Sequence, residues 1–112
     1  MSVLDTCLLL SVDAEENRFR FFAIELRARD DGAAEIRRRW GRVGTDGRVD
    51  VEVFEDEAQA RIAWDALVRR RERRGYVAAA TADLRTARRL LAWHRSRRLS
   101  PRQLAFPVAA GF

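Results

Sequence analysis

The 112-residue sequence contains no lysine, one cysteine and one histidine. Cys7 alone cannot form an internal disulfide, and neither a multi-cysteine nor a multi-histidine metal site can be assembled. The single histidine, His94, follows Trp93 and is interpreted as a helix-surface or packing residue. A phosphate-binding loop of the Gly-x-x-x-x-Gly-Lys type is excluded because it needs a lysine. We therefore expect no metal, no cofactor and no enzymatic activity.

Long hydrophobic runs are also missing. The apolar run at residues 8–10 is shorter than a secretion signal and lacks a basic leader. No stretch approaches the length that crosses a bilayer. These absences predict a cytoplasmic protein without a membrane partner, and the length suits one compact domain.

Arginine is abundant, with 22 residues in the chain. Residues 1–57 carry 9 arginines and 14 acidic residues, a net charge of −5, whereas residues 58–112 carry 13 arginines and 3 acidic residues, a net charge of +10. Such a basic half favours a polyanionic partner, with nucleic acid ahead of membrane headgroups. Two other interpretations stay open: a solvated helix face, and a GC-rich coding bias that replaces lysine by arginine.

Four segments show the alternation that is typical of strands. We expect them at residues 6–12, 18–29, 34–43 and 49–54, separated by turns such as Asp46-Gly47. In the last segment Val49, Val51 and Val53 are predicted to form the core face. A bulge near Gly41 would relieve the mixture of apolar and charged residues on one face of the third segment.

Two helices should follow. Asp56 is the expected N-cap of the first, which is predicted to begin near Glu57 and to end at Gly75. Its apolar residues recur at helical spacing, namely Ala60, Ala63, Trp64 and Leu67. The second helix is expected at residues 82–98, with Thr81 as its cap and a stripe formed by Leu84, Ala87, Leu91 and Arg95. The sequence thus predicts an α+β fold: a small antiparallel β-sheet of about four strands packed by a helix, with an additional C-terminal helix.

Three blocks resemble the WGR domain family. They are Asn17-x-x-Arg20-x-Phe22, then Trp40-Gly41-Arg42-Val43-Gly44-Thr45-x-Gly47, then Gly75-Tyr76 at the end of the first helix. The resemblance implies a WGR-like domain at residues 1–76. Residues 77–112 would form a helical extension with an apolar tail that carries Leu104, Phe106, Val108 and Phe112.

The family occurs in DNA-damage-activated poly(ADP-ribose) polymerases and in bacterial proteins of unclear role. The resemblance implies that Trp40 packs against a terminal nucleotide and that Arg42 lies at the DNA interface, with Asn17, Arg20 and Tyr76 as further backbone contacts. Phe22 stands where the family commonly has tyrosine, so a hydroxyl is missing there. No polymerase domain follows in this sequence, so a break signal would not be relayed within the chain.

Elementary chemistry supports the same surface, because an aromatic ring can cover the exposed face of a nucleotide and Arg42 can bind phosphate. Gly41 and Gly44, which lack a Cβ, would let their backbone approach the ligand. Arg39, in the basic run beside the motif, would extend the surface. We therefore expect a DNA-binding module, with ends or nicks as candidate targets. The alternative is a protein-interaction adaptor that uses the basic face and the apolar tail, and a lone tryptophan in a strand is also compatible with a core role.

Overall fold

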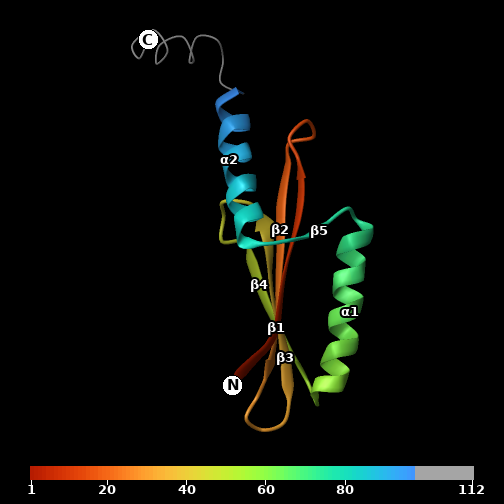
Figure 1. Ribbon diagram of the computed structural model, residues 1–112. Coiled ribbons are helices and arrows are strands. Elements are labelled where there is room, and N and C mark those ends of the chain that lie inside the picture. The colour runs from red at the N-terminus through yellow and green to blue at the C-terminus, as the bar shows by residue number, and fades with distance from the viewer. Residues whose placement is uncertain (98–112) are drawn as a thin grey trace.

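The computed structural model describes residues 1–97, and the predicted apolar tail lies outside the described residues. The α+β class predicted from the sequence is confirmed (Figure 1). Along the chain the elements are β1 (Ser2–Asp13), β2 (Arg18–Ala28), β3 (Ala34–Arg42), β4 (Arg48–Phe54), α1 (Glu57–Arg73), β5 (Val77–Ala79) and α2 (Thr81–Arg97).

The strands form one antiparallel sheet in the order β4-β3-β2-β1-β5. The four predicted strands are consecutive in space because each is joined to the next by a hairpin. The fifth strand, β5, was not expected, and it pairs with β1 through Leu8↔Ala79 and Leu10↔Val77. A strand of three residues is too short for alternation to reveal it in a sequence.

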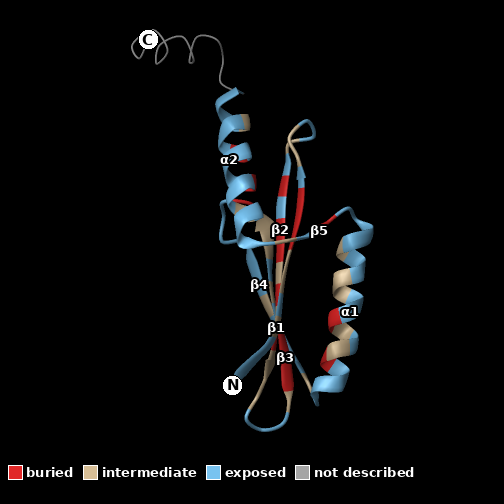
Figure 2. Cartoon of the chain, in the orientation of Figure 1, coloured by how far each residue is buried: buried red, intermediate tan, exposed pale blue. Residues whose placement is uncertain are grey.

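One side of the sheet, here called the α1 face, packs against α1. Asp56 caps this helix by accepting a hydrogen bond from the Gln59 amide over 2.9 Å, as predicted. The predicted apolar side of α1 contributes the buried Ala60 and Trp64. Together with strand residues they form the larger core, in which the buried members are Leu9, Phe22, Ile24, Leu26, Ala34, Ile36, Ala60, Trp64 and Tyr76 (Figure 2).

The opposite side of the sheet, the α2 face, packs against α2 through a smaller set of buried residues. Its buried residues are Leu10, Phe19, Phe21, Val43, Ala87 and Leu91. Neighbouring phenylalanines of β2 thus enter different cores, which explains why this strand reads as apolar on both sides. At the start of α2 the Ala80 amide donates to the Asp83 carboxylate over 2.8 Å. Thr81 is the first helical residue, so its prediction as the cap is wrong by one position.

The valine row of β4 is not core. Val49, Val51 and Val53 are 54%, 45% and 52% exposed. They lie on the α2 face, where α2 does not reach β4, whereas Phe54 on the other side packs against the larger core. The prediction that the valines mark the core face is therefore wrong, because alternation shows that two faces differ without showing which one a helix covers.

Candidate nucleic-acid interface

Two arginines and a tryptophan of the predicted site lie in adjacent rows of β2 and β3 near one end of the sheet. In the β2–β3 register Phe22 lies opposite Trp40, and Arg20 lies opposite Arg42. Residues two apart on a strand share a face, so Arg20 and Arg42 continue the row that begins with Phe22 and Trp40. Arg20 is exposed and Arg42 is half-buried. This end of the sheet therefore combines an aromatic ring with two guanidinium groups.

Arg42 is held in place by Asn17, in the turn between β1 and β2. Its guanidinium donates to the side-chain oxygen of Asn17 over 2.9 Å and to the Asn17 carbonyl over 3.3 Å. The same guanidinium lies 5.6 Å from the ring centroid of Phe19. Both acceptors are uncharged, and within residues 1–97 neither Arg42 nor Arg20 forms an ion pair. Arg42 is thus oriented while its positive charge remains uncompensated.

Trp40 is half-buried, with part of its indole packed against the larger core. The guanidinium of Arg38 lies 5.9 Å from the centroid of the Trp40 ring. Arg38 is in turn bound to Asp50 of β4 over 2.6 Å. The hydrogen bond from Arg38 lowers the pKa of Asp50. The indole is therefore fixed by packing and still presents part of its surface.

The Arg38–Asp50 pair was missed by the sequence analysis, which treated Arg38 only as part of a basic run. The signal that could have found it is the hairpin register, in which Arg38 lies directly opposite Asp50. Opposite charges at directly paired positions stabilise a sheet, and the turn at Asp46-Gly47 fixes the pairing.

The glycines of the motif serve the fold of the β3–β4 turn. A Cβ built on Gly41 would lie 2.8 Å from the Gly47 Cα, and one built on Gly47 would lie 2.3 Å from the Trp40 carbonyl oxygen. The turn therefore folds back on β3 with no room for a side chain at either position. The β2–β3 register runs without interruption through Gly41, so the predicted bulge is wrong. This internal packing explains why Gly41 has no Cβ, and the approach of a ligand to its backbone stays a prediction.

Arg39 lies on the face opposite Trp40, whereas Tyr76 belongs to the larger core against which Trp40 packs. Arg39 projects from the α2 face, with its guanidinium 5.5 Å from the Phe21 ring centroid. Tyr76 is only 7% exposed, and its hydroxyl accepts a hydrogen bond from Arg71 over 3.4 Å. The guanidinium of Arg71 also lies 4.4 Å from the Phe22 ring centroid. Nucleic-acid contacts by Arg39 and Tyr76 stay predictions.

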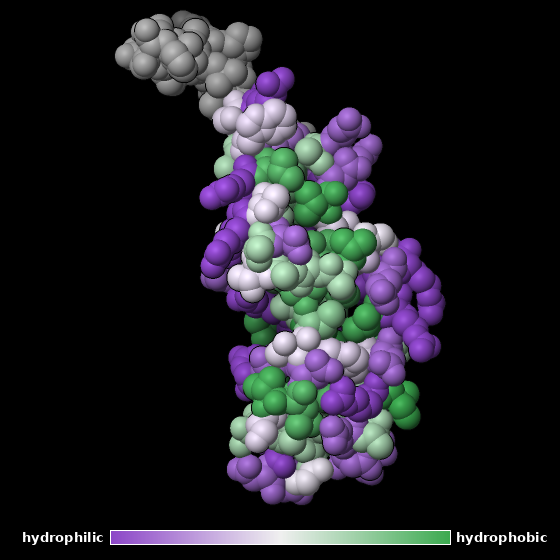
Figure 3. Space-filling view, in the orientation of Figure 1, coloured by the Kyte–Doolittle hydropathy of each residue, from purple (hydrophilic) through white to green (hydrophobic). Residues whose placement is uncertain are grey.

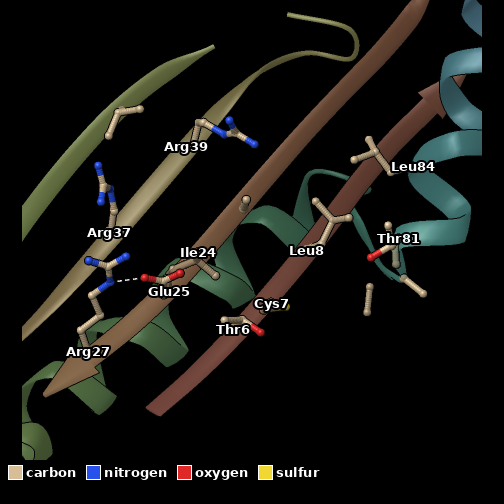
Figure 4. Close-up of a pocket in the computed structure, with 15 residues that line it drawn as sticks. Thr6, Cys7, Leu8, Ile24, Glu25, Arg27, Arg37, Arg39, Thr81 and Leu84 are labelled. Carbon is tan, nitrogen blue, oxygen red and sulfur yellow. Dashed lines mark hydrogen bonds and ion pairs between the residues drawn. The ribbon is translucent and has the colours of Figure 1, made fainter. Parts of the chain in front are cut away.

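A second feature is an open groove of about 850 Å³ on the α2 face. Figure 4 shows Arg37 and Arg39 extending from β3 into this groove, while Arg27 is bound to Glu25 beside them. Leu84 of α2 lies at the other side. The exposed valines of β4 begin at its edge, since Val49 also lines it. Apolar and hydrophilic surface alternate along the molecule in the space-filling view (Figure 3).

Cys7 and His94 show no arrangement for catalysis. Burial, followed by the carboxylates of Asp5 and Glu72, raises the pKa of the Cys7 thiol, which disfavours the reactive thiolate. The His94 ring packs against Phe19 with centroids 5.5 Å apart, which confirms its interpretation as a packing residue. Within residues 1–97 no three metal-binding side chains cluster. Neither helix of this region is long and apolar enough to cross a membrane.

The fold and this end of the sheet define a small α+β domain with an aromatic and basic surface. The model of the WGR domain family matches residues 5–83, and the chain belongs to this family. Domains of this family are in general non-catalytic modules that bind nucleic acids.

A solved structure shares the fold. It is the crystal structure of a protein from Bacteroides fragilis, determined by the Northeast Structural Genomics Consortium, with a TM-score of 0.57 and 21% sequence identity. The match covers 71% of this chain and 21% of that one, so this chain spans about one fifth of that protein's length. None of the curated proteins compared with this chain matches it.

Proposed function

We propose that this chain is a non-catalytic DNA-binding module that holds a strand end or nick at Trp40 and Arg42. The observation that carries the proposal is that Arg42, oriented by Asn17 and without an ion pair in residues 1–97, follows the half-buried Trp40 in the same row of β3. The indole would cover the exposed face of a terminal nucleotide, and Arg42 with Arg20 would bind the adjoining phosphates. Base stacking on an aromatic ring contributes about 1–3 kcal/mol per base.

The experiment is a fluorescence-anisotropy titration with nicked, blunt-ended and single-stranded DNA and with RNA. If about three phosphates are neutralised, the logarithm of the affinity should fall against the logarithm of salt concentration with a slope of roughly −2 to −3. Nicked or blunt DNA is expected to bind most tightly. A flat response to salt contradicts phosphate binding, and equal affinity for continuous duplex and ends contradicts end recognition.

Variants locate the contact. Trp40→Ala and Arg42→Gln should each weaken binding to nicked DNA without unfolding the domain. Arg37→Gln is the matched control, because it removes the same charge from the α2 face, where Arg37 is exposed and forms no ion pair within residues 1–97. Equal losses in Arg37→Gln and Arg42→Gln would contradict a site at Arg42.

The groove on the α2 face favours a second function, as a protein-interaction adaptor. Exposed valine side chains contribute nothing to the binding of a hydrated phosphate backbone. A protein segment that alternates acidic and apolar residues could instead pair its carboxylates with Arg37 and pack its apolar side chains on the valine row. Synthetic peptides with alternating glutamate and leucine are the probe. Binding that is lost in Val51→Ser and in Arg37→Gln and kept in Trp40→Ala would support the adaptor, and no binding to the wild-type chain would reject it.

A further inference from the structure

Helix α2 begins where the family match ends, since the match covers residues 5–83 and α2 spans Thr81–Arg97. Most of this helix is thus an addition to the family's domain in this chain. One side of this helix packs on the sheet: Ala87 and Leu91 are buried in the same cluster as Phe19 and Phe21, and His94 contacts the Phe19 ring. The packed side fixes which way every other residue of α2 points.

The arginines of α2 are not equivalent. Arg88 and Arg95 are seven residues apart, which is close to two full turns, so they point in nearly the same direction. Both line a hollow of about 430 Å³ between α2 and the β3–β4 turn, whose other lining residues are Gly44, Leu91 and Ala92. Arg89 lies on the side opposite the packed residues, and Arg97 lies over the Trp93 ring on the other flank.

This hollow adjoins the Trp-Gly-Arg motif. Gly44, which lines the hollow, follows Arg42 by two residues, and Phe19 links Arg42 to α2 because its ring centroid lies 5.6 Å from the Arg42 guanidinium and 5.5 Å from the His94 ring. Gly44 is exposed and has a φ of +91°, and a Cβ built on it would only touch Leu91 at 3.9 Å. Among the residues that line the hollow, Gly44 is the one from the turn, and it has no side chain to fill the space beside Arg88 and Arg95.

The charge around the hollow is positive. None of the arginines of α2 forms an ion pair within the part of the chain that the structure describes. The nearby acidic residue of the turn is Asp46, which is exposed to solvent. Arg88 and Arg95 are seven residues apart, which corresponds to about 10 Å along the helix axis. The two arginines would therefore bind separate charges of an extended polyanion rather than one small anion. A phosphate backbone has this property.

We propose that α2 is a second phosphate-binding element, in which Arg88 and Arg95 hold the nucleic-acid backbone where it passes over the β3–β4 turn from Trp40 and Arg42. This rests on the proposed function. The bound nucleic acid then runs around the end of the sheet, from the α1 face to α2. An acidic protein partner is disfavoured here, because the hollow offers only Leu91 and Ala92 as apolar surface beside the two charges.

The test compares two variants of equal charge, Arg88→Gln/Arg95→Gln and Arg89→Gln/Arg97→Gln, by anisotropy with nicked duplex DNA over a range of salt concentrations. With Arg88 and Arg95 added to Arg42 and Arg20, about four phosphates are neutralised and the wild-type slope should be roughly −3 to −4. Loss of two contacts should lower its steepness by about 2 and weaken binding about tenfold or more near 0.1 M salt. The second variant should bind like the wild type. Circular dichroism checks that α2 remains helical in both.

Three outcomes are informative. Wild-type affinity in Arg88→Gln/Arg95→Gln, together with weakened binding in Trp40→Ala, overturns the role of α2 and leaves the proposed function standing. Equal weakening in both double variants also overturns it, because the effect would then be one of net charge. A wild-type chain that binds no nucleic acid overturns the proposed function itself.

Discussion

Arg42 donates two hydrogen bonds to Asn17, a residue 25 positions earlier in the chain. The two residues belong to different blocks of the family motif, and the fold of the β1–β2 hairpin brings them together. Asn17 has a φ of +51°, in the left-handed region that asparagine tolerates better than most residues. The turn therefore supplies two neutral acceptors that aim the guanidinium without neutralising it.

Asn17→Gly should weaken DNA binding by roughly fivefold, since a lost hydrogen bond costs about 1 kcal/mol. Glycine keeps the positive φ without strain, so the unfolding free energy should change little. Asn17→Ala should weaken binding equally and in addition lose about 1–2 kcal/mol of stability through backbone strain. The dissociation constant for nicked DNA measures the effect on binding, and urea unfolding measures the effect on stability. Unchanged affinity in Asn17→Gly would show that Arg42 needs no support from this residue.

Gly47→Ala should destabilise the domain by roughly 3 kcal/mol or more, because its Cβ would lie 2.3 Å from the Trp40 carbonyl oxygen. Gly32→Ala is the control: Gly32 has a φ of +87°, and a Cβ built on it would meet no atom of residues 1–97 within 4 Å, so only the conformational cost of about 1–2 kcal/mol applies. Urea unfolding of both variants measures the difference. Equal losses would mean that the turn moves away from β3 without cost.

Val51→Ser should cost less than about 1 kcal/mol, since Val51 is 45% exposed. Ile36→Ala on the same sheet should cost about 2–5 kcal/mol, because Ile36 is buried in the larger core. A large loss of unfolding free energy in Val51→Ser would show that the valine row is buried in solution, as the sequence predicted.

These comparisons show what the sequence could predict. The hairpins, α1 and its cap follow from local signals such as Asp46-Gly47 and Asp56, and the structure confirms them. The exposed valines could not be foreseen, because which face of a strand is covered depends on where α1 and α2 pack. β5 was not predicted because a strand of three residues is too short to show an alternation of apolar and polar side chains.

The candidate site divides in the same way. The motif identified Trp40, Arg42, Arg20 and Asn17, and the register places them at one end of the sheet. Alternation along β3 separates Arg39 from Trp40 by one residue and so sends them to opposite faces. Tyr76 is buried in the larger core together with Leu9 and Phe22, which lie far from it in the sequence, so no single segment predicts its burial.

The Arg38–Asp50 pair predicts a pH dependence. Because Arg38 lowers the pKa of Asp50 below its ordinary 3.8, the pair's contribution to stability is present above that value and is lost as the pH falls through the lowered pKa. Asp50→Asn should therefore be less stable than the wild type at neutral pH, and the difference should vanish in acid below the lowered pKa. Asp46→Asn, at a site with no ion pair within residues 1–97, is the control. Urea unfolding midpoints of the wild type and both variants, measured from neutral pH to below the lowered pKa, test this prediction. A difference between Asp50→Asn and the wild type that does not change with pH would contradict a stabilising Arg38–Asp50 pair.

The central claim is that Trp40 meets the nucleic acid, and the emission of Trp40 tests it most directly. The chain has three tryptophans, so Trp64→Phe and Trp93→Phe together leave Trp40 as the sole tryptophan, whose emission can be excited selectively over that of tyrosine, with folding checked by circular dichroism. Titration with nicked DNA should quench this emission along the same curve that anisotropy gives for binding. Binding by anisotropy with unchanged Trp40 emission would contradict the claim.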